Sequence, residues 1–321
     1  MKRCDLKCCD LKRCVPVSGQ KWLPLMFTLL LAWASAGAVQ AASVWKVSDG
    51  EREMYLAGTV HLLKSSDYPL PTAFEVAYEH SDVLMFETDL AAAHDPENQQ
   101  QITRRMLAGP EETVDKVLTA HTYGTLQQAC ERYGLNLSDL RSFKVSLLVL
   151  TLTMVEMKRL GLTSSGVDEY FHQRARRDGK AIVTLESFEQ QIDFLARMGR
   201  GNEDAFVAMS LRDLNQTEAL MDDMIQSWRN GDMETMTQLF VENMEDDYPA
   251  MYQQLLVDRN NHWMPRIEAL LLQPGTAFVL VGVGHMVGEA GLLSQLTARG
   301  YEVQTVPDAA PDAVPDTDTG F

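Results

Sequence analysis

The sequence predicts an α/β protein: a central parallel or mixed β-sheet flanked by helices, with long helical insertions over the carboxyl ends of the strands. The first observation is a set of short apolar runs with the length of buried strands, at residues 55–57, 83–86, 181–185 and 278–281. The second is that helical patterns separate these runs, which favours a sheet covered by helices on both faces. The third is that two of the intervening stretches are much longer than one covering helix, so we interpret them as insertions.

The first 41 residues have the pattern of a cleaved signal peptide. Basic residues up to Lys21 precede an uncharged apolar run at 22–34, and small residues follow it up to an acceptable cleavage site, Val39-Gln40-Ala41. An uncleaved membrane anchor is the alternative, because residues 22–42 carry no charge, but their second half is only weakly apolar. We therefore expect a signal peptide at 1–41, a periplasmic or secreted protein, and no stable membrane insertion after cleavage.

Charge and cysteine content restrict the possible partners. Four of the five cysteines lie within residues 1–41, so the mature chain keeps only Cys130 and has no internal disulfide. The whole chain has 28 basic and 45 acidic residues, and without residues 1–41 the balance is 22 against 43, a net charge of −21. A surface this acidic repels nucleic acid and anionic lipid headgroups. We expect a peptide or small-molecule substrate, and the sequence indicates no oligomeric state.

The amino-terminal part is expected to begin with two paired strands. Residues 44–47 and 53–57 have strand patterns, and the Ser48-Asp49-Gly50 sequence between them is typical of a turn. Two prolines in Tyr68-Pro69-Leu70-Pro71 exclude regular structure in the stretch that follows. A helix and then a strand that ends at Glu87 come next.

The first insertion, residues 90–178, is expected to be helical. A helix is predicted over 122–134, with Thr122 as its N-cap and a glycine at its end. Residues 145–155 are apolar enough for a buried helix, but eleven residues cannot cross a bilayer. A further helix over 167–178 is stopped by a glycine and leads into the next strand.

The second insertion, residues 187–272, is also expected to be helical. It contains eight methionines between residues 198 and 251, which we interpret as core filler. A strand to Gly284, a helix over 289–298 and a last strand at 301–306 complete a domain that we expect to span residues 42–306. Proline and aspartate alternate with small residues beyond it, which predicts a disordered tail at 307–321.

Two of the predicted strands run into the same pattern: a glycine, two spacers and a histidine. The first is Gly58-Thr59-Val60-His61 and the second is Gly282-Val283-Gly284-His285. Gly58 and Gly282 allow close backbone approach, and we assign both to the binding of a cofactor. Because the frame recurs, we favour a functional role for His61 and His285 over a purely structural one. The other histidines lack this frame and are expected to be structural or solvent-facing.

Two further strands end on an acid, and a polar pair precedes the last histidine strand. A buried carboxylate needs a partner, so Glu87 either belongs to a site, pairs with an arginine or caps the next segment. Glu186 likewise either belongs to the site or helps to cap the helix that follows, since the sequence from Glu186 to Glu189 is typical of a helix cap. Arg259 and Asn260 could supply an anion contact or an oxyanion donor, and the alternative is a surface pair.

These residues predict one site, because ligands of open α/β sheets bind at the carboxyl ends of the strands. We expect His61, Glu87 and His285 to converge in one cleft with Glu186 at its wall. Imidazole and carboxylate together suit a divalent metal such as zinc, manganese, iron or cobalt, so His61, His285 and Glu87 are the candidate ligands. Without metal, the same groups could perform general acid–base hydrolysis. The chain lacks the H-E-x-x-H and G-x-S-x-G motifs, which argues against a helix-borne zinc peptidase and a common serine esterase.

The ordered series of motifs resembles the TraB/GumN family, in the larger group that includes the TIKI proteases, the ChaN-like haem-binding proteins and the erythromycin esterases. The resemblance covers roughly residues 44–306. One small departure is Ser187, where the family pattern leads us to expect threonine. The matching pieces are Gly58-Thr59-Val60-His61, Tyr68-Pro69-Leu70-Pro71, Phe86-Glu87-Thr88-Asp89, Leu185-Glu186-Ser187 with Glu189-Gln190-Gln191, Arg259-Asn260, and Gly282-Val283-Gly284-His285 with Gly288.

The resemblance implies an α/β fold with both G-x-x-H motifs at one site. In the TIKI relatives it implies metal-dependent proteolysis, with manganese or cobalt as cofactor. We therefore expect an exported metal-dependent hydrolase, most simply a peptidase that uses manganese, cobalt or zinc. The alternatives are a haem- or metal-binding periplasmic protein, in which Met286 or Tyr68 contributes to the pocket, and a metal-free esterase.

Overall fold

The computed structural model describes residues 41–162 and 166–308. The predicted signal peptide, apart from Ala41, and residues 309–321 of the predicted tail lie outside the described residues. Within the part that is described, no helix is long and apolar enough to span a bilayer.

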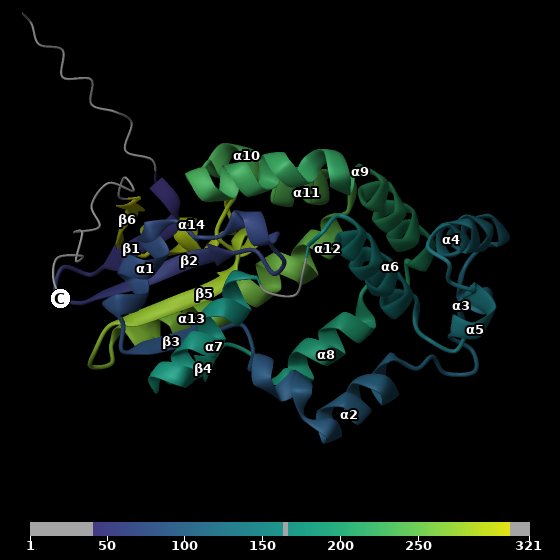
Figure 1. The fold of residues 1–321 in the computed structure, drawn as a ribbon, viewed down its shortest axis with the longest axis horizontal. Helices are drawn as coiled ribbons and strands as arrows, with labels where there is room; N and C mark the ends of the chain where they lie inside the picture. Colours follow the sequence, from purple (N-terminus) through teal and green to yellow (C-terminus); the bar gives the residue numbers. More distant parts are fainter. Residues whose placement is uncertain (1–40, 163–165, 309–321) are drawn as a thin grey trace, which may run out of the picture. The chain divides into compact units, whose positions relative to one another are not determined.

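The described strands form one mixed sheet in which the four strands that lead to the candidate site are parallel. The strands are β1 (Ala41–Ser48), β2 (Glu53–Thr59), β3 (Val83–Phe86), β4 (Ala181–Thr184), β5 (Ala277–Gly282) and β6 (Glu302–Pro307). Their order across the sheet is β4-β3-β5-β2-β1-β6 (Figure 1). Neighbours from β4 to β2 pair in parallel, whereas β1 pairs antiparallel with both β2 and β6. The α/β prediction with a mixed sheet is confirmed.

The first two strands form the predicted pair because the turn between them is stabilised locally. Gly50 has a φ of +92°, a left-handed conformation that favours glycine. The Asp49 carboxylate accepts backbone N–H groups of Glu51 and Arg52 at 3.0 and 2.8 Å. The hairpin places β2 at the centre of the sheet beside β5.

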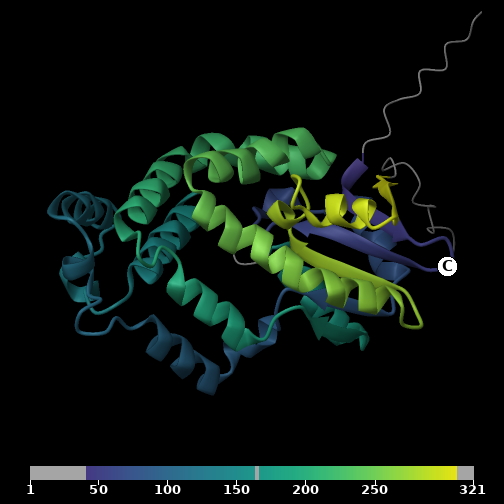
Figure 2. The same cartoon turned by 180° about the vertical axis from the view of Figure 1, so that it is seen from behind.

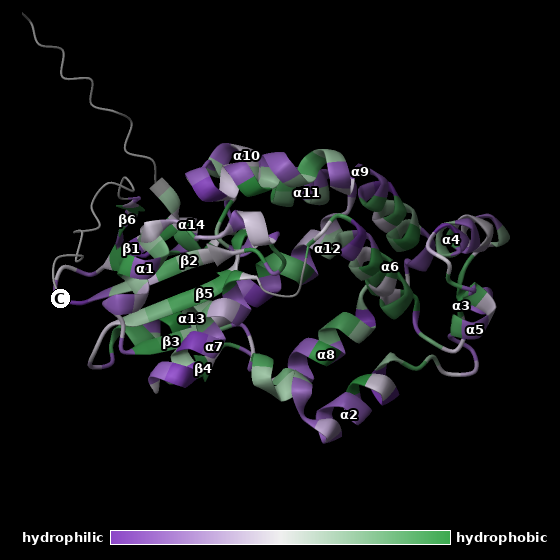
Figure 3. Ribbon diagram, in the orientation of Figure 1, coloured by the Kyte–Doolittle hydropathy of each residue, from purple (hydrophilic) through white to green (hydrophobic). Residues whose placement is uncertain are grey.

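Helices cover both faces of the sheet, as the sequence predicts. Helices α1 (Thr72–Glu79) and α7 (Val167–Asp178) lie on one face, and α13 (Asp258–Leu271) and α14 (Leu292–Ala298) lie on the other (Figures 1 and 2). The central strands are apolar along their length, because both of their faces are covered (Figure 3). The largest fully buried side chains in this core are those of Trp228, Trp263, Tyr78, Phe74, Phe86, Phe171 and Phe278.

Two runs of helices form the insertions. The first, between β3 and α7, contains α2 (Pro96–Met106), α3 (Val114–Val117), α4 (Ala120–Arg132), α5 (Leu137–Leu140) and α6 (Val145–Arg159). The second, between β4 and α13, contains α8 (Phe188–Arg197), α9 (Glu203–Asn230), α10 (Met233–Thr237), α11 (Asn243–Asp247) and α12 (Pro249–Tyr252). Short 3₁₀ turns lie at Ser65–Asp67, Leu90–His94 and Val283–His285, and π-helical turns lie at Gln238–Glu242 and Gln253–Val257.

The boundaries of three predicted helices were wrong by a few residues. Helix α4 begins two residues earlier than predicted, because the Thr119 hydroxyl, not that of Thr122, caps the helix by accepting the Thr122 N–H. Helix α6 extends to Arg159 and is only partly buried, with Leu150 and Met154 exposed. Helix α14 begins at Leu292 rather than at residue 289.

The methionines of the second run pack as core filler. Met221 and Met236 are buried, and the other six are partly buried against the apolar clusters. Unbranched thioether side chains suit such irregular helix contacts. These residues therefore support the helices and do not form an exposed methionine surface.

Candidate active site

The two G-x-x-H motifs leave the sheet side by side. Strands β2 and β5 are parallel neighbours in a register that places Gly58 opposite Val281 and Thr59 opposite Gly282. Glu87 directly follows β3, and Glu186 lies two residues after β4. The Glu186 N–H donates to the Glu87 carbonyl oxygen at 2.8 Å, so the two acidic strand ends are also joined. The predicted site residues thus meet at the carboxyl edge of the four parallel strands.

The first motif holds its imidazole through a carboxylate from α7. Nδ1 of His61 lies 2.8 Å from Oδ2 of Asp168, and the Thr59 hydroxyl donates to Oδ1 of the same carboxylate at 2.5 Å. The His61 side chain is 67% exposed, whereas Asp168 is 10% exposed. The charge of Asp168 and its hydrogen bond to the ring raise the pKa of His61 above its usual value. With Nδ1 held by Asp168, Nε2 is the nitrogen that His61 presents to a ligand.

A glycine brings Asp168 to this position. The Val167 N–H donates to the Val60 carbonyl oxygen at 3.0 Å, which joins the start of α7 to the first motif. A Cβ at Gly166 would lie only 2.2 Å from the carbonyl carbon of His61. Since only glycine fits there, Gly166 allows the amino end of α7 to reach the histidine loop.

The second motif holds its imidazole through an amide from α13. Asn260 donates from Nδ2 to the carbonyl oxygens of His285 and Ala290 at 3.2 and 2.9 Å, so its Oδ1 is the acceptor for Nδ1 of His285 at 2.7 Å. Nε2 of His285 then accepts from Nη1 of Arg259 at 3.1 Å. His285 is 5% exposed, and its burial lowers its pKa to about 3 against the opposing charge of Glu87. This histidine is therefore neutral at physiological pH.

Arg259 connects the second motif to both acids. Its guanidinium donates to Glu87 at 2.6 Å and to Glu186 at 2.8 and 3.1 Å. Trp263 lies beneath it, with the guanidinium carbon 4.4 Å from the ring centroid, and donates from Nε1 to Glu186 at 2.9 Å. Burial alone would raise the pKa of Glu87, but the charge of Arg259, the histidines and a 2.8 Å hydrogen bond from the Gly282 N–H lower it to about 2. Both alternatives for Glu87 are thus present together, an arginine pair and a place at the site.

Gly282 marks the point where the side chains meet. A Cβ at this residue would lie 3.3 Å from Oε1 of Glu87, 3.6 Å from Nε2 of His61 and 3.8 Å from Cδ2 of His285. A Cβ at Gly58 would instead lie 2.8 Å from the Val283 side chain and 3.1 Å from its Cα. Gly282 therefore keeps space open between the functional groups, whereas Gly58 allows the two motif loops to pack against each other.

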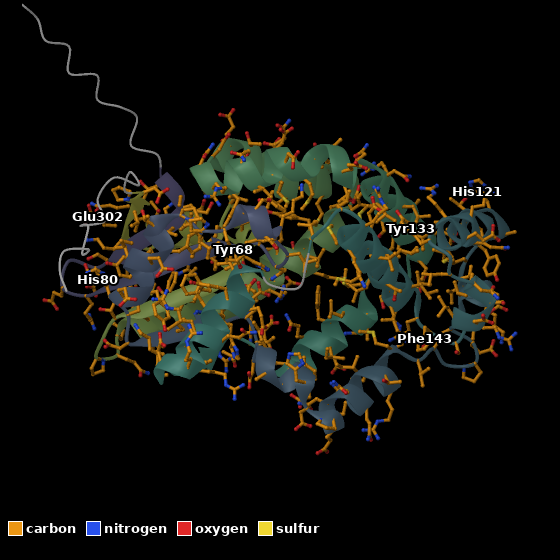
Figure 4. The ribbon with its side chains drawn as sticks, in the orientation of Figure 1. Tyr68, His80, His121, Tyr133, Phe143 and Glu302 are labelled. Carbon is orange, nitrogen blue, oxygen red and sulfur yellow. The ribbon has the colours of Figure 1, made fainter. Side chains whose placement is uncertain are left out.

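The remaining histidines lie as expected. His80 and His121, which Figure 4 labels, are exposed, as are His94 and His262. His172 is buried and lies 3.3 Å from an Asp89 carboxylate oxygen. The cap of α8 comes from Ser187 in a capping box with Gln190, so Glu186 has no part in it.

Three residues of the site were not predicted from the sequence. Asp168 and Thr59 form the carboxylate support of His61, and Trp263 packs on His285 with ring centroids 4.3 Å apart. An acid in the first turn of a helix is common, so the position of Asp168 gave no distinctive signal. Trp263 lies four residues after Arg259 on α13, and this helical spacing places both on the face that covers the site.

The donors suit a divalent metal in type, but only Glu87 and His285 suit it in protonation state, because the raised pKa of His61 means that this imidazole would have to release a proton to bind an ion. Metal ligands must be deprotonated, and Glu87 is ionised while His285 is neutral. A carboxylate behind the metal-binding imidazole, as at His61, is the usual support for a histidine ligand. However, in the described part of the chain no group of three or more histidine, cysteine or acidic side chains is already arranged around one metal position. His285 also has its Nε2 engaged by Arg259.

Comparison with known proteins gives the family of the chain. The model of the TraB/PrgY/gumN family matches residues 43–305, and the chain belongs to this family. It is 23% identical over 252 residues to the uncharacterized protein YbaP of Escherichia coli K12, a match that covers 77% of this chain and 89% of YbaP. It is also 25% identical over 311 residues to the metalloprotease TIKI2 of Danio rerio, which covers 80% of this chain and 59% of TIKI2.

Proposed function

We propose that the protein is an exported, metal-dependent hydrolase that cleaves peptide bonds. The observation that carries the proposal is the meeting of His61, Glu87 and His285 around Gly282, with each imidazole held through Nδ1 by an oxygen acceptor. The similarity to a relative named as a metalloprotease supports hydrolysis. Export to the periplasm or the exterior rests on the predicted signal peptide.

His61 and Glu87 would hold the metal, and His285 would join them when Arg259 releases its Nε2. Manganese, cobalt and zinc all accept imidazole and carboxylate ligands. When bound, such an ion lowers the pKa of a coordinated water and polarises the scissile carbonyl group.

The surrounding residues prepare this centre. Asp168 orients the His61 ring and fixes which nitrogen faces outward. Arg259 keeps a positive charge between Glu87, Glu186 and His285, where it can stabilise a negative charge that develops on the substrate oxygen. A carboxyl with a pKa of about 2 is a weak base at neutral pH, so Glu87 is better suited to bind a cation than to accept a proton.

The contact between Arg259 and His285 favours a second candidate, metal-free hydrolysis. In that case the arginine itself supplies the positive charge, and the imidazole paired with Asp168 acts as the acid–base group. The haem alternative is less well supported. Met286 is fully buried in the core, and Nε2 of His285 is already engaged.

Peptide hydrolysis with and without metal tests the proposal. The chain from Ala42 onward is treated with chelator, given manganese, cobalt or zinc, and incubated with a mixed peptide library whose products are identified by mass spectrometry. We expect cleavage that at least one of these ions restores, that His61→Ala abolishes and that the exposed-histidine control His80→Ala retains. Cleavage that persists in chelator supports the metal-free candidate, and a folded protein that cleaves no peptide with or without metal contradicts the proposed peptidase.

A further inference from the structure

Phe194 on α8 is a large aromatic side chain whose position is not explained by apolar packing. It is only partly buried, and it packs against none of the three apolar clusters that the described residues form. The centroid of its ring instead lies 5.3 Å from the guanidinium carbon of Arg259. A cation within about 6 Å of the centre of an aromatic ring is attracted to the face of that ring. Phe194 therefore contacts the arginine of the candidate active site from a separate helix.

The opposite face of α8 holds this helix in place. Its buried side chains form a small cluster with Met106 of α2, namely Phe188, Ile192 and Ala196. Phe194 lies two residues after Ile192 and two before Ala196, so its side chain leaves the helix on the side away from this cluster. Figures 1 and 2 show α8 between α2 and α13. The core of α8 thus faces α2, and Phe194 faces the helix that carries Arg259.

Two kinds of contact hold Arg259. Its N–H groups donate to two carboxylates and to Nε2 of His285, and its guanidinium carbon lies 4.4 Å from the ring centroid of Trp263 and 5.3 Å from that of Phe194. Trp263 belongs to α13, as Arg259 does. Phe194 is therefore the ring contact that depends on how a second helix packs.

The contact bears on metal binding because Nε2 of His285 is engaged by Arg259. A ring nitrogen has one lone pair, so it cannot accept a hydrogen bond from Arg259 and bind a metal ion at the same time. Only molecules in which Arg259 has moved away can bind an ion through His285, and a small fraction of such molecules weakens the apparent affinity. Any contact that restrains Arg259 therefore opposes the ion.

We propose that Phe194 is a positioning residue that keeps Arg259 on Nε2 of His285 and thereby weakens the binding of a metal ion by that histidine. The inference rests on the proposed metal-dependent function. It makes α8, which follows the strand end that carries Glu186, part of the control of the site.

Nitrogen NMR of the metal-free protein tests the position of Arg259. Phe194→Leu keeps an apolar side chain but removes the ring, whereas Phe194→Tyr keeps the ring. We expect Phe194→Leu to shift the Nε2 signal of His285 downfield, the direction for an unprotonated ring nitrogen that loses a hydrogen-bond donor, and Phe194→Tyr to leave it unchanged. The matched control is Phe143→Leu, which removes a partly buried ring that packs against a different cluster and should not move the signal (Figure 4).

Calorimetric titration of the chelator-treated protein with manganese or zinc tests the effect on metal binding. Loss of a cation–π contact changes an equilibrium constant by a few-fold, so Phe194→Leu should bind the ion about threefold more tightly than the wild type. Phe194→Tyr and Phe143→Leu should bind it like the wild type. In a His285→Ala background the gain from Phe194→Leu should disappear, because the ion and Arg259 no longer compete for Nε2.

Several outcomes would overturn the proposal. It fails if Phe194→Leu leaves the Nε2 signal of His285 in place, if Phe194→Tyr behaves like Phe194→Leu, or if tighter binding of the ion persists without His285. A wild-type protein that binds no ion contradicts the proposed metal-dependent function, whereas the Nε2 signal, which is recorded without metal, still decides whether Phe194 positions Arg259.

Discussion

The two G-x-x-H loops leave neighbouring parallel strands in the same sequence frame, yet they place their imidazoles in opposite electrostatic environments. His61 is 67% exposed and faces the carboxylate of Asp168, which raises its pKa. His285 is 5% exposed, faces the amide of Asn260 and the guanidinium of Arg259, and has a pKa of about 3. The strand and its glycine therefore determine where each imidazole lies, whereas the helix packed against the loop determines the charge of the imidazole. Helix α7 supplies an acid to one loop, and α13 supplies an amide and a cation to the other.

This difference suggests a division of roles. The exposed loop presents a nitrogen that a substrate or metal can reach, and the buried loop keeps a neutral imidazole beside two ionised carboxylates and an arginine. If the two loops act in one centre, changes on either side should have distinct and measurable effects.

The largest effect is expected on the exposed side. His61→Ala should lower the rate of peptide hydrolysis about 10²–10⁴-fold, the range for the loss of a catalytic imidazole. Asp168→Asn keeps the size of the supporting side chain but removes its charge, and should cost about 10–100-fold. Initial rates of hydrolysis by these variants and by His80→Ala measure both effects. An Asp168→Asn variant as active as the wild type would show that the charge of Asp168 is not needed for hydrolysis.

A large change in stability is expected on the buried side. Arg259→Gln leaves Glu87 and Glu186 buried without their cation, which should lower the free energy of unfolding by about 3–5 kcal/mol. Arg212→Gln removes a solvent-exposed pair with Asp247 and should change it by less than about 1 kcal/mol. Urea denaturation of the two variants measures both, and equal stabilities would mean that Arg259 does not stabilise the acids.

Alanine substitutions of the two motif glycines should have different effects, one on stability and the other on hydrolysis. A Cβ at Gly58 collides with Val283, so Gly58→Ala should lower the free energy of unfolding by about 1–3 kcal/mol. A Cβ at Gly282 approaches only the ends of the Glu87, His61 and His285 side chains, so Gly282→Ala should fold normally but lose hydrolysis. Thermal unfolding and rate measurements on both variants check this, and the idea that Gly282 keeps the centre open fails if Gly282→Ala hydrolyses at the wild-type rate.

The smallest perturbation is a titration of the unmodified protein. Nitrogen NMR of metal-free protein should show His285 neutral, with the proton on Nδ1, down to a pH of about 3, while His61 stays charged to a pH above its ordinary value. The direction of each pKa shift follows from the neighbouring groups, because a carboxylate stabilises the imidazolium and burial beside a guanidinium destabilises it. Coincident titration of the two rings near their ordinary pKa would remove the distinction between the loops.

The sequence predicted the sheet, the two histidine loops and the acidic strand ends, because strand length, apolar content and the G-x-x-H frame are local patterns. It did not predict Asp168, which lies 107 residues from its partner His61 and has the sequence context of an ordinary helix start. Arg259 and Asn260 were candidates, but their contacts with Glu87, Glu186 and His285 depend on how α13 packs. The N-cap of α4 was misassigned because Thr119 and Thr122 are both good caps, and only the backbone geometry selects between them.

A double-mutant cycle on peptide hydrolysis tests most directly whether the two loops form one centre. The rates of His61→Ala, His285→Ala and the double variant are compared with that of the wild type under the metal condition that gives the highest activity. If both imidazoles serve one reaction, the double variant should be about as slow as the slower single variant, because groups that act as a unit are strongly non-additive. If instead the double variant loses activity by the product of the two single losses, the histidines act independently, which contradicts the claim that the two loops form one centre.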